Sequence, residues 1–321
     1  MYIAKLQRIG GCAWLILPCG FASLLLSGCA DTDQFQAPIA SFAAAAESSA
    51  TSFSALDAKS AANLTALRQA EALQVKRVAY SGSDCALTSK GCSLYFRQGS
   101  GSDPKPVYVA SIVPKSVAFI NGIRDYANAL NQLEKADATA DVQSAFSSAM
   151  GTVSAVAGAL NLPAGAASAM LNKPLSATIG WSFGEYQNQV KDEALKSATK
   201  AADPIIQQAM PILDAELRLA RTAQTSELEQ DFQAKDDAFS HQPTEATLKA
   251  EIQSANALDA ALSSKPSDLF DSLAVAHSKL AAAIQNPKSD PSESIAAIAA
   301  FVQQAQNIEQ MIKVISPTIK N

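Results

Sequence analysis

The chain has 321 residues, of which 25 are lysine or arginine and 30 are aspartate or glutamate, so its formal net charge is −5. A mildly acidic chain without a basic cluster is a poor candidate for a nucleic-acid-binding protein, because such proteins gather Lys and Arg against phosphate. Alanine and serine are abundant, whereas only 6% of the residues are aromatic. Cores of this composition bury less apolar area per residue than leucine-rich cores, and we expect slim, closely packed helices.

Residues 1–28 have the pattern of an export signal. Lys5 and Arg8 give a positive start without acids, and residues 10–26 contain no charged side chain. An apolar run of this length, interrupted by Pro18, is too short for a membrane span and suits the apolar region of a signal peptide.

The leader ends in Leu26, Ser27, Gly28 and Cys29, which resembles the lipobox of bacterial lipoproteins. The resemblance implies cleavage between Gly28 and Cys29 and a membrane anchor through lipid on Cys29. It places the protein in the bacterial envelope, with an ordinary secreted protein as the alternative. Ala30 follows the cysteine in place of the aspartate that marks retention in the inner membrane. The family's sorting rule therefore favours the outer membrane, facing the periplasm.

After the signal peptide we expect a lipid-anchored tether over residues 29–33 and one helical domain over residues 34–321. The domain is interrupted by a small insert over residues 80–112, which contains Cys85 and Cys92. In an oxidising compartment, two cysteines separated by six residues predict a structural disulfide. A metal site would need further His or Cys nearby, and a redox pair usually has a two-residue spacing.

The insert is the part of the chain without a helical pattern. Two short β-prone runs, Cys92–Phe96 and Val107–Ala110, flank a turn-forming segment over residues 97–104. These runs predict a β-hairpin that the disulfide pins at its base. The hairpin is either a binding tip or a stapled connector between two helices.

The remaining residues show helical spacing of apolar side chains. The expected helices span about residues 34–79, 114–133, 139–160, 175–239, 243–262, 267–284 and 291–315. Pro204 and Pro211 are expected to kink or divide the longest of them, with Asp203 able to cap the second piece. The sequence therefore predicts an all-α fold, an elongated and mainly antiparallel bundle of six to eight helices.

One segment suggests membrane activity. From Val142 to Phe183 the only ionisable side chain is Lys173, and the chain turns near Pro163. Two uncharged arms about a proline resemble the membrane-inserting hairpin of helical pore-forming cytolysins. The arms consist mostly of Ala, Gly, Ser and Thr, which favour insertion weakly. A helix pair wholly buried inside the bundle is the preferred interpretation, with a partner-binding surface and a membrane hairpin as alternatives.

The titratable residues do not form a recognisable catalytic or metal motif. His241 lies in an expected loop, and His277 lies near the apolar face of its helix, where a structural role is typical. Several carboxylates share one long helix and are expected on a solvated face: Glu227, Glu229, Asp231, Asp236 and Asp237. Their spacing fits neither a calcium loop nor a di-iron pattern. We predict no catalytic residue, metal or cofactor.

These observations favour a non-enzymatic envelope lipoprotein, acting as a helical interaction or spacer module at the membrane surface. Its expected partners are the membrane, through Cys29, and an envelope protein, but not nucleic acid. The alternatives are a pore-forming or membrane-remodelling protein that uses residues 142–183, and a periplasmic bundle that binds a small ligand between its helices.

Overall fold

The computed structural model describes residues 33–75, 78–81, 93–96, 105–162, 183–263, 265–286 and 291–315. These ranges belong to one compact unit, Thr32–Asn321. Cys29, Cys85 and Cys92 lie outside the described residues, so the lipid anchor and the disulfide stay predictions.

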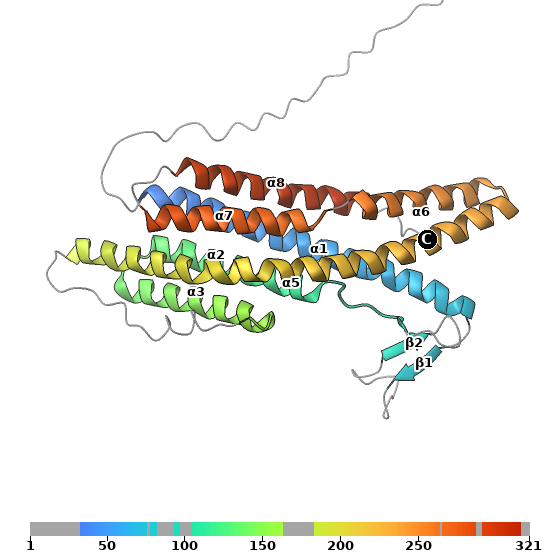
Figure 1. The fold of residues 1–321 in the computed structure, drawn as a ribbon, viewed down its shortest axis with the longest axis horizontal. Helices are drawn as coiled ribbons and strands as arrows, with labels where there is room; N and C mark the ends of the chain where they lie inside the picture. The colour runs from blue at the N-terminus through green and yellow to red at the C-terminus, as the bar shows by residue number, and fades with distance from the viewer. Residues whose placement is uncertain are drawn as a thin grey trace, which may run out of the picture. The chain divides into compact units, whose positions relative to one another are not determined.

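Helices dominate the described part of the chain, which confirms the predicted helical class (Figure 1). A 3₁₀ turn at Asp33–Phe35 is followed by α1 Gln36–Val75, α2 Pro114–Lys135, α3 Thr139–Ala159, α5 Phe183–His241, α6 Glu245–Ser263, α7 Ser267–Gln285 and α8 Ser292–Ile315. A proline explains where α2 begins. Pro114 is its first residue, a position at which the backbone N–H would have no partner within the helix, so the missing N–H costs nothing.

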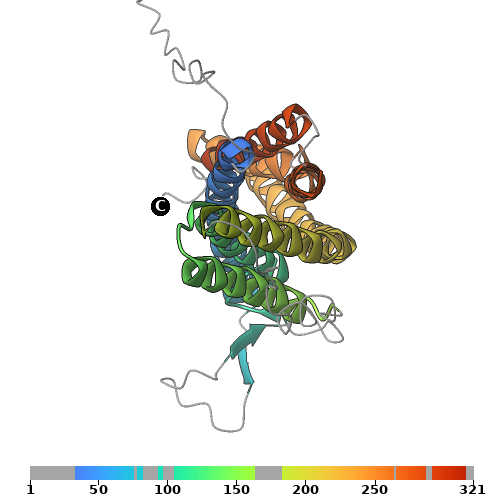
Figure 2. The same ribbon diagram turned by 90° about the vertical axis from the view of Figure 1, so that its left-hand side faces the viewer.

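Six of the helices close a ring around a shared core, as the end-on view in Figure 2 shows. Around the ring, α1 packs on α2, α2 on α3, α3 on α5, α5 on α7, α7 on α8, and α8 on α1. Two contacts show that helices α1 and α8 run parallel. Phe42 lies against Phe301, and further along both helices Ser52 donates a hydrogen bond to Glu309.

The core is built from a few large side chains among many alanines. The largest fully buried side chains are Tyr126, Phe42, Phe53, Phe119, Phe301, Ile39, Ile120, Leu130, Leu133, Met150 and Ile206. Small residues let the helices approach one another. At Gly122 on α2, an added Cβ would lie 2.2 Å from Cγ2 of Val156 on α3. The expectation of closely packed helices therefore holds for this pair.

Helix α5 continues through both of its prolines, so the predicted division at Pro204 and Pro211 is wrong. A proline inside a helix costs about 3 kcal/mol. Ile205 and Ile206 are almost fully buried beside Pro204, and each contributes about 1.5–3 kcal/mol of apolar burial. Packing against the neighbouring helices therefore offsets the lost backbone hydrogen bond. Asp203 caps nothing and instead contacts α7.

The insert forms a small antiparallel sheet of order β1-β2-β3, with β1 Val78–Ser81, β2 Ser93–Phe96 and β3 Lys105–Pro106. The predicted first helix is therefore too long, because Val78 and Ala79 pair with Phe96 and Tyr95. The predicted strand Val107–Ala110 is also wrong, since the third strand ends at Pro106.

Hydrogen bonds to α1 explain why the third strand is so short. The N–H of Val107 still donates to the carbonyl of Leu94 at 2.7 Å. Two residues later the N–H of Val109 donates to Oγ1 of Thr65 at 3.0 Å. The chain thereby leaves the sheet and follows α1, to which Ala72 and Val107 attach the sheet through a small apolar cluster.

The N-terminus of α2 is held by carboxylates from two other helices. Asp57 of α1 accepts hydrogen bonds from the N–H groups of Ile112 and Val113, at 2.8 and 3.2 Å. Glu216 of α5 accepts from the N–H groups of Lys115 and Ser116, at 2.9 and 2.7 Å. Because the first N–H groups of a helix have no partner within it, these carboxylates replace a local cap.

We expect Glu216→Ala to lower the free energy of unfolding by about 1–2 kcal/mol, because it removes a charge-assisted cap from α2. Urea unfolding followed by circular dichroism measures this change. Glu293→Ala is the control, since Glu293 forms an exposed ion pair with Lys279 and its loss should change stability by no more than about 0.5 kcal/mol. Equal effects of the two substitutions would contradict the capping role.

Candidate functional site

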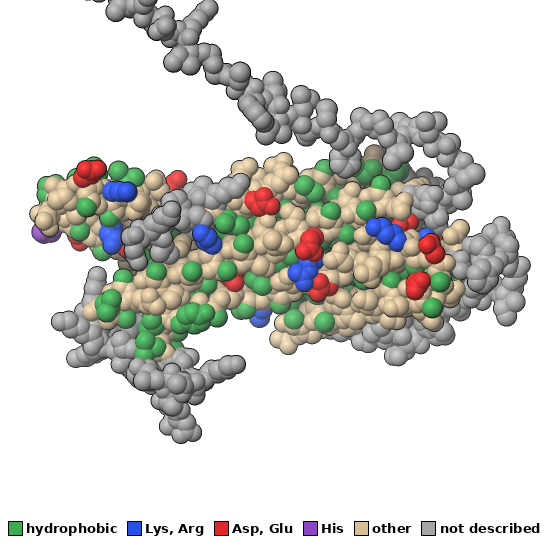
Figure 3. Space-filling model, turned by 180° about the vertical axis from the view of Figure 1, so that it is seen from behind, with side chains coloured by type: hydrophobic (Ala, Val, Ile, Leu, Met, Phe, Trp, Pro, Cys, Tyr) green, Lys and Arg blue, Asp and Glu red, His purple; other side chains and the backbone are tan. Residues whose placement is uncertain are grey.

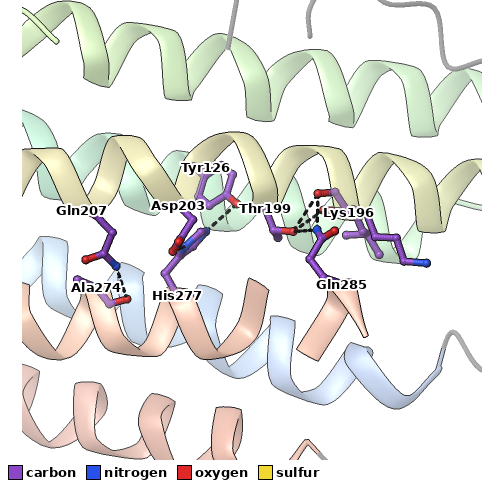
Figure 4. Close-up of polar contacts among 9 residues, drawn as sticks. Tyr126, Lys196, Thr199, Asp203, Gln207, Ala274, His277 and Gln285 are labelled. Atoms are coloured by element: carbon purple, nitrogen blue, oxygen red, sulfur yellow. Dashed lines mark hydrogen bonds and ion pairs between the residues drawn. The ribbon is translucent and has the colours of Figure 1, made fainter. Parts of the chain in front are cut away.

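A polar network lies inside the bundle where α2, α5 and α7 meet (Figure 4). The hydroxyl of Tyr126 lies 3.0 Å from Nε2 of His277, and Nδ1 of His277 lies 3.1 Å from Oδ1 of Asp203. A carboxylate accepts hydrogen bonds only, so in the neutral form of His277 the ring proton lies on Nδ1 and Nδ1–H donates a hydrogen bond to Asp203. Nε2 then accepts from Tyr126, and every member of the network is satisfied.

The network has little contact with solvent. Tyr126 and His277 are fully buried, and only Asp203 is partly exposed, at 30%. The Phe42 ring packs against His277, with 5.9 Å between ring centroids. Burial raises the pKa of Tyr126 well above its ordinary value, and the negative charge of Asp203 raises it further. The Tyr126 phenol therefore stays protonated and remains a hydrogen-bond donor.

Further polar contacts extend this row along the interface between α5 and α7. Gln207 donates to the carbonyl of Ala274 at 3.3 Å, and Gln285 donates to the carbonyl of Lys196 at 2.7 Å. Positions 199, 203 and 207 of α5 are one turn apart, so they face α7 together. Increasing numbers on α5 meet decreasing numbers on α7, and the contacts thereby fix an antiparallel register between these helices.

A hydroxyl, an imidazole and a carboxylate in this order are the groups of a nucleophilic enzyme. Catalysis also requires space for a substrate beside the nucleophile. The described cavities have other linings and do not reach Tyr126 or His277. Among the described residues, no cluster of three or more His, Cys, Asp or Glu side chains could hold a metal ion. Among the described residues, the arrangement joins α2, α5 and α7 through two hydrogen bonds.

A second charged cluster joins the insert to the bundle. Arg68 of α1 binds the carboxylate of Glu227 on α5, with Nη2 at 2.9 Å and Nε at 3.2 Å from Oε1. Its Nη1 donates to the carbonyl of Pro106 at 3.0 Å. Burial raises the pKa of the neighbouring Glu71, and Glu227 adds to the rise while Lys105 and Arg68 oppose it. One guanidinium thus ties α1, α5 and the sheet together.

This cluster corrects the expected solvated row of carboxylates. Glu227 is only 9% exposed and paired with Arg68, so the expectation is wrong for this residue. Asp231 is partly exposed and its pKa is raised by burial, against the opposing charge of Lys235. The other three carboxylates, Glu229, Asp236 and Asp237, are exposed as expected. No local signal distinguishes Glu227, because Arg68 is 159 residues away.

The two histidines have different environments. His277 is fully buried, which confirms the expected structural position. His241 is the last residue of α5 rather than a loop residue, and its exposed ring contacts the carbonyl of Asp237 at 2.8 Å. Sequence spacing could not place Tyr126 beside His277, since 151 residues separate them.

The described part of the uncharged segment lies in α3. Eight α3 side chains are buried, including Phe146, Met150 and Val153, whereas Gln143 and Ser147 on the opposite face are exposed. The expectation of a wholly buried helix is therefore wrong for α3, which buries only one face. No described helix combines the length and the apolar character needed to cross a membrane. Residues 163–182 lie outside the described residues.

The main described cavity is small. It has a volume of about 60 Å³, whereas ligand pockets have volumes of about 300–1,000 Å³. Its lining comes from α1, α5, α6 and the residues before α2, and comprises Phe53, Leu56, Asp57, Ser60, Ile112, Val113, Leu217, Ala220, Arg221, Gln224, Ala261 and Pro266. A cavity of this size has room for a few water molecules.

The chain matches no protein family, no curated protein and no solved structure.

We expect Tyr126→Phe to lower the free energy of unfolding by about 1–3 kcal/mol, because it leaves Nε2 of His277 buried without a donor. In a His277→Leu background the same substitution should cost far less, since no unsatisfied nitrogen remains. Urea unfolding of the four proteins gives the coupling energy, expected at about 1 kcal/mol or more. Additive effects would contradict the network.

We also expect a pH dependence from Tyr126. Above pH 10, the ordinary tyrosine value, the phenol ionises in the unfolded chain but stays protonated in the fold. Stability contributed by Tyr126 is therefore complete below this pH and falls by about 1.4 kcal/mol per pH unit above it. The difference in unfolding free energy between the wild type and Tyr126→Phe should therefore shrink between pH 9 and pH 11. These two conditions lie about one pH unit below and above the ordinary pKa of tyrosine.

Tyr108→Phe is the matched control for the pH experiment, because the Tyr108 side chain is 72% exposed. This variant should follow the wild type throughout. A gap between wild type and Tyr126→Phe that is constant with pH would show that the Tyr126 phenol ionises equally in both states.

Proposed function

We propose that the protein is a lipid-anchored, non-catalytic component of the bacterial envelope, and that its helical bundle acts as an interaction or spacer module at the membrane surface. The observation that carries the proposal is the sequence Leu26-Ser27-Gly28-Cys29 at the end of an apolar leader. The anchored protein would lie in the outer membrane and face the periplasm, with an envelope protein as its partner and no role in binding nucleic acid.

The short distance between the cysteine and the first helix supports a role close to the membrane. The 3₁₀ turn begins at Asp33, four residues after Cys29. An extended tether of this length spans about 14 Å. Lipid on Cys29 would therefore hold the start of α1, which begins at Gln36, close to the headgroups.

The proposal includes an elongated bundle and a disulfide between Cys85 and Cys92. In the chain-entropy model, a loop this short gains about 2–3 kcal/mol from its crosslink. The strands that flank residues 82–92 are β1, which ends at Ser81, and β2, which begins at Ser93. The disulfide would thus close the connection between two paired strands.

The use of polar groups favours an interaction module over an enzyme or a ligand-binding protein. Tyr126, His277 and Asp203 satisfy one another inside the bundle, and the main described cavity is too small for a metabolite. A pore-forming role is less well supported, because Phe146 and Met150 of α3 pack inside the bundle instead of facing outward. Insertion of α3 would expose the core of the ring.

We expect Cys29→Ser to abolish incorporation of an alkyne-labelled palmitate and to move the protein from the membrane fraction to the soluble fraction. The thiol of Cys29 is the attachment point of the lipid, so loss of the sulfur removes the anchor. Cys12→Ser and Cys19→Ser are the matched controls and should remain labelled and membrane-bound. Unchanged labelling of Cys29→Ser would refute the lipoprotein assignment.

Density-gradient separation of the two membranes tests the location, and crosslinking of the full chain in living cells tests the interaction module. An inner-membrane position, or a chain that crosslinks to no protein, would contradict the corresponding part of the proposal.

A further inference from the structure

The distal part of α5 and the whole of α6 form a pair of helices with little covering. We call residues 228–263 the α5–α6 arm (Figure 1). From Glu229 to His241 no side chain of α5 is buried, and in α6 only Ser254 and Ala261 are buried. The two helices pack mainly on each other, and α6 makes a smaller contact with α8. The outer surfaces of the arm are therefore available to a partner.

The outer face of α6 carries apolar side chains. Leu248 and Ile252 are one helical turn apart and are 42% and 51% exposed, and Leu262 is 48% exposed. Hydrophobic side chains lie among charged ones on the surface in Figure 3. Residues at i and i+4 form a continuous ridge on a helix, which is the element that a second helix packs against.

The arm also carries most of the net negative charge of the protein. It has seven carboxylates and two lysines: Glu229, Asp231, Asp236, Asp237, Glu245, Glu251, Asp259, Lys235 and Lys249. Its formal charge is therefore 2 − 7 = −5, which equals that of the whole chain. Outside the arm the whole chain has 23 acidic and 23 basic residues. Cleavage before Cys29 would remove Lys5 and Arg8, which leaves a charge of 21 − 23 = −2 outside the arm. Five of the seven excess negative charges of the cleaved chain thus lie on the arm, which also carries the exposed side chains of Leu248, Ile252 and Leu262.

We propose that the α5–α6 arm is a docking surface for a basic, amphipathic helix of a partner protein. The ridge at Leu248 and Ile252 would take the apolar face of that helix, and the surrounding carboxylates would attract its Lys and Arg side chains. An anionic bilayer does not fit this surface, because its charge has the same sign as the arm. The inference deepens the interaction part of the proposed function and does not depend on the lipid.

The test uses the full chain in detergent and a fluorescent synthetic peptide of about 18 residues, five helical turns, with Leu on one face and Lys on the other. A scrambled peptide of the same composition controls for charge alone. We expect the amphipathic peptide to bind at least tenfold more tightly than the scrambled one by fluorescence anisotropy. Its affinity should fall as salt rises, because exposed charges are screened.

Two pairs of variants separate the apolar from the electrostatic contribution. Leu248→Glu with Ile252→Glu should weaken binding at least tenfold, whereas Val275→Glu, at a 54% exposed position on α7, should leave it unchanged. Asp236→Asn with Asp237→Asn should weaken binding and flatten its salt dependence. The control Asp137→Asn with Asp141→Asn removes two exposed acids outside the arm and should change neither. Unfolding midpoints verify that each variant folds.

Equal binding of the peptide to all variants would overturn the proposal, and so would equal binding of the scrambled peptide. Binding of anionic vesicles that depends on Leu248 and Ile252 would also overturn it, because the arm would then be a membrane contact. In cells, an arm variant that keeps the crosslinked partner of the wild type would refute the arm and leave the proposed function standing. Absence of palmitate labelling in the wild type would refute the lipid anchor and would not affect the proposed docking surface on the arm.

Discussion

The buried histidine of α7 is the interaction on which the arrangement of the other helices depends. A neutral imidazole needs one donor and one acceptor, and α2 supplies the first through Tyr126 while α5 supplies the second through Asp203. Alanine-rich helices have shallow and similar ridges, so apolar contacts alone distinguish poorly between neighbouring registers. A slip by one turn would leave buried polar groups unpaired, at about 1–3 kcal/mol for each group. The network thereby selects one register for three helices.

Helix α5 also contacts other parts of the described bundle through charged side chains. Beyond Asp203, Glu216 on the same helix holds the start of α2, and Glu227 holds Arg68 and with it the small sheet. The helix continues through two prolines, and at Pro204 the burial of Ile205 and Ile206 offsets the lost backbone hydrogen bond. Its last turns leave the ring and form the arm with α6. One continuous element thus connects the core, the insert and the most acidic surface.

The distribution of polar groups separates internal from external roles. The side chains of His277, Tyr126 and Arg68 form hydrogen bonds or ion pairs inside the described fold. These contacts join the helices to one another and to the insert. Most of the uncompensated negative charge lies on the arm, together with the exposed side chains of Leu248, Ile252 and Leu262. The described fold therefore separates its internal polar contacts from the surface at which we propose that a partner docks.

The sequence by itself determined the helical class and most helix bounds. Apolar periodicity and proline or glycine punctuation act over a few residues, so Pro114 and Ser267 could be recognised as helix starts without a structure. The buried position of His277 followed in the same way from the apolar face of its helix. Tertiary structure alone decided the partners. Asp203, a predicted cap, binds a histidine 74 residues away, and Glu227, predicted on a solvated face, binds an arginine 159 residues away.

The same limit applies to the insert. Residues Val107–Ala110 have the composition of a strand, but the backbone N–H of Val109 binds Thr65, 44 residues earlier. Local propensity fixes what a segment can form, and the hydrogen-bond partners brought by distant segments fix what it does form. The accessible arm is likewise a tertiary property. Its carboxylates and leucines are visible in the sequence, but only the packing of α6 on α5 leaves them uncovered together.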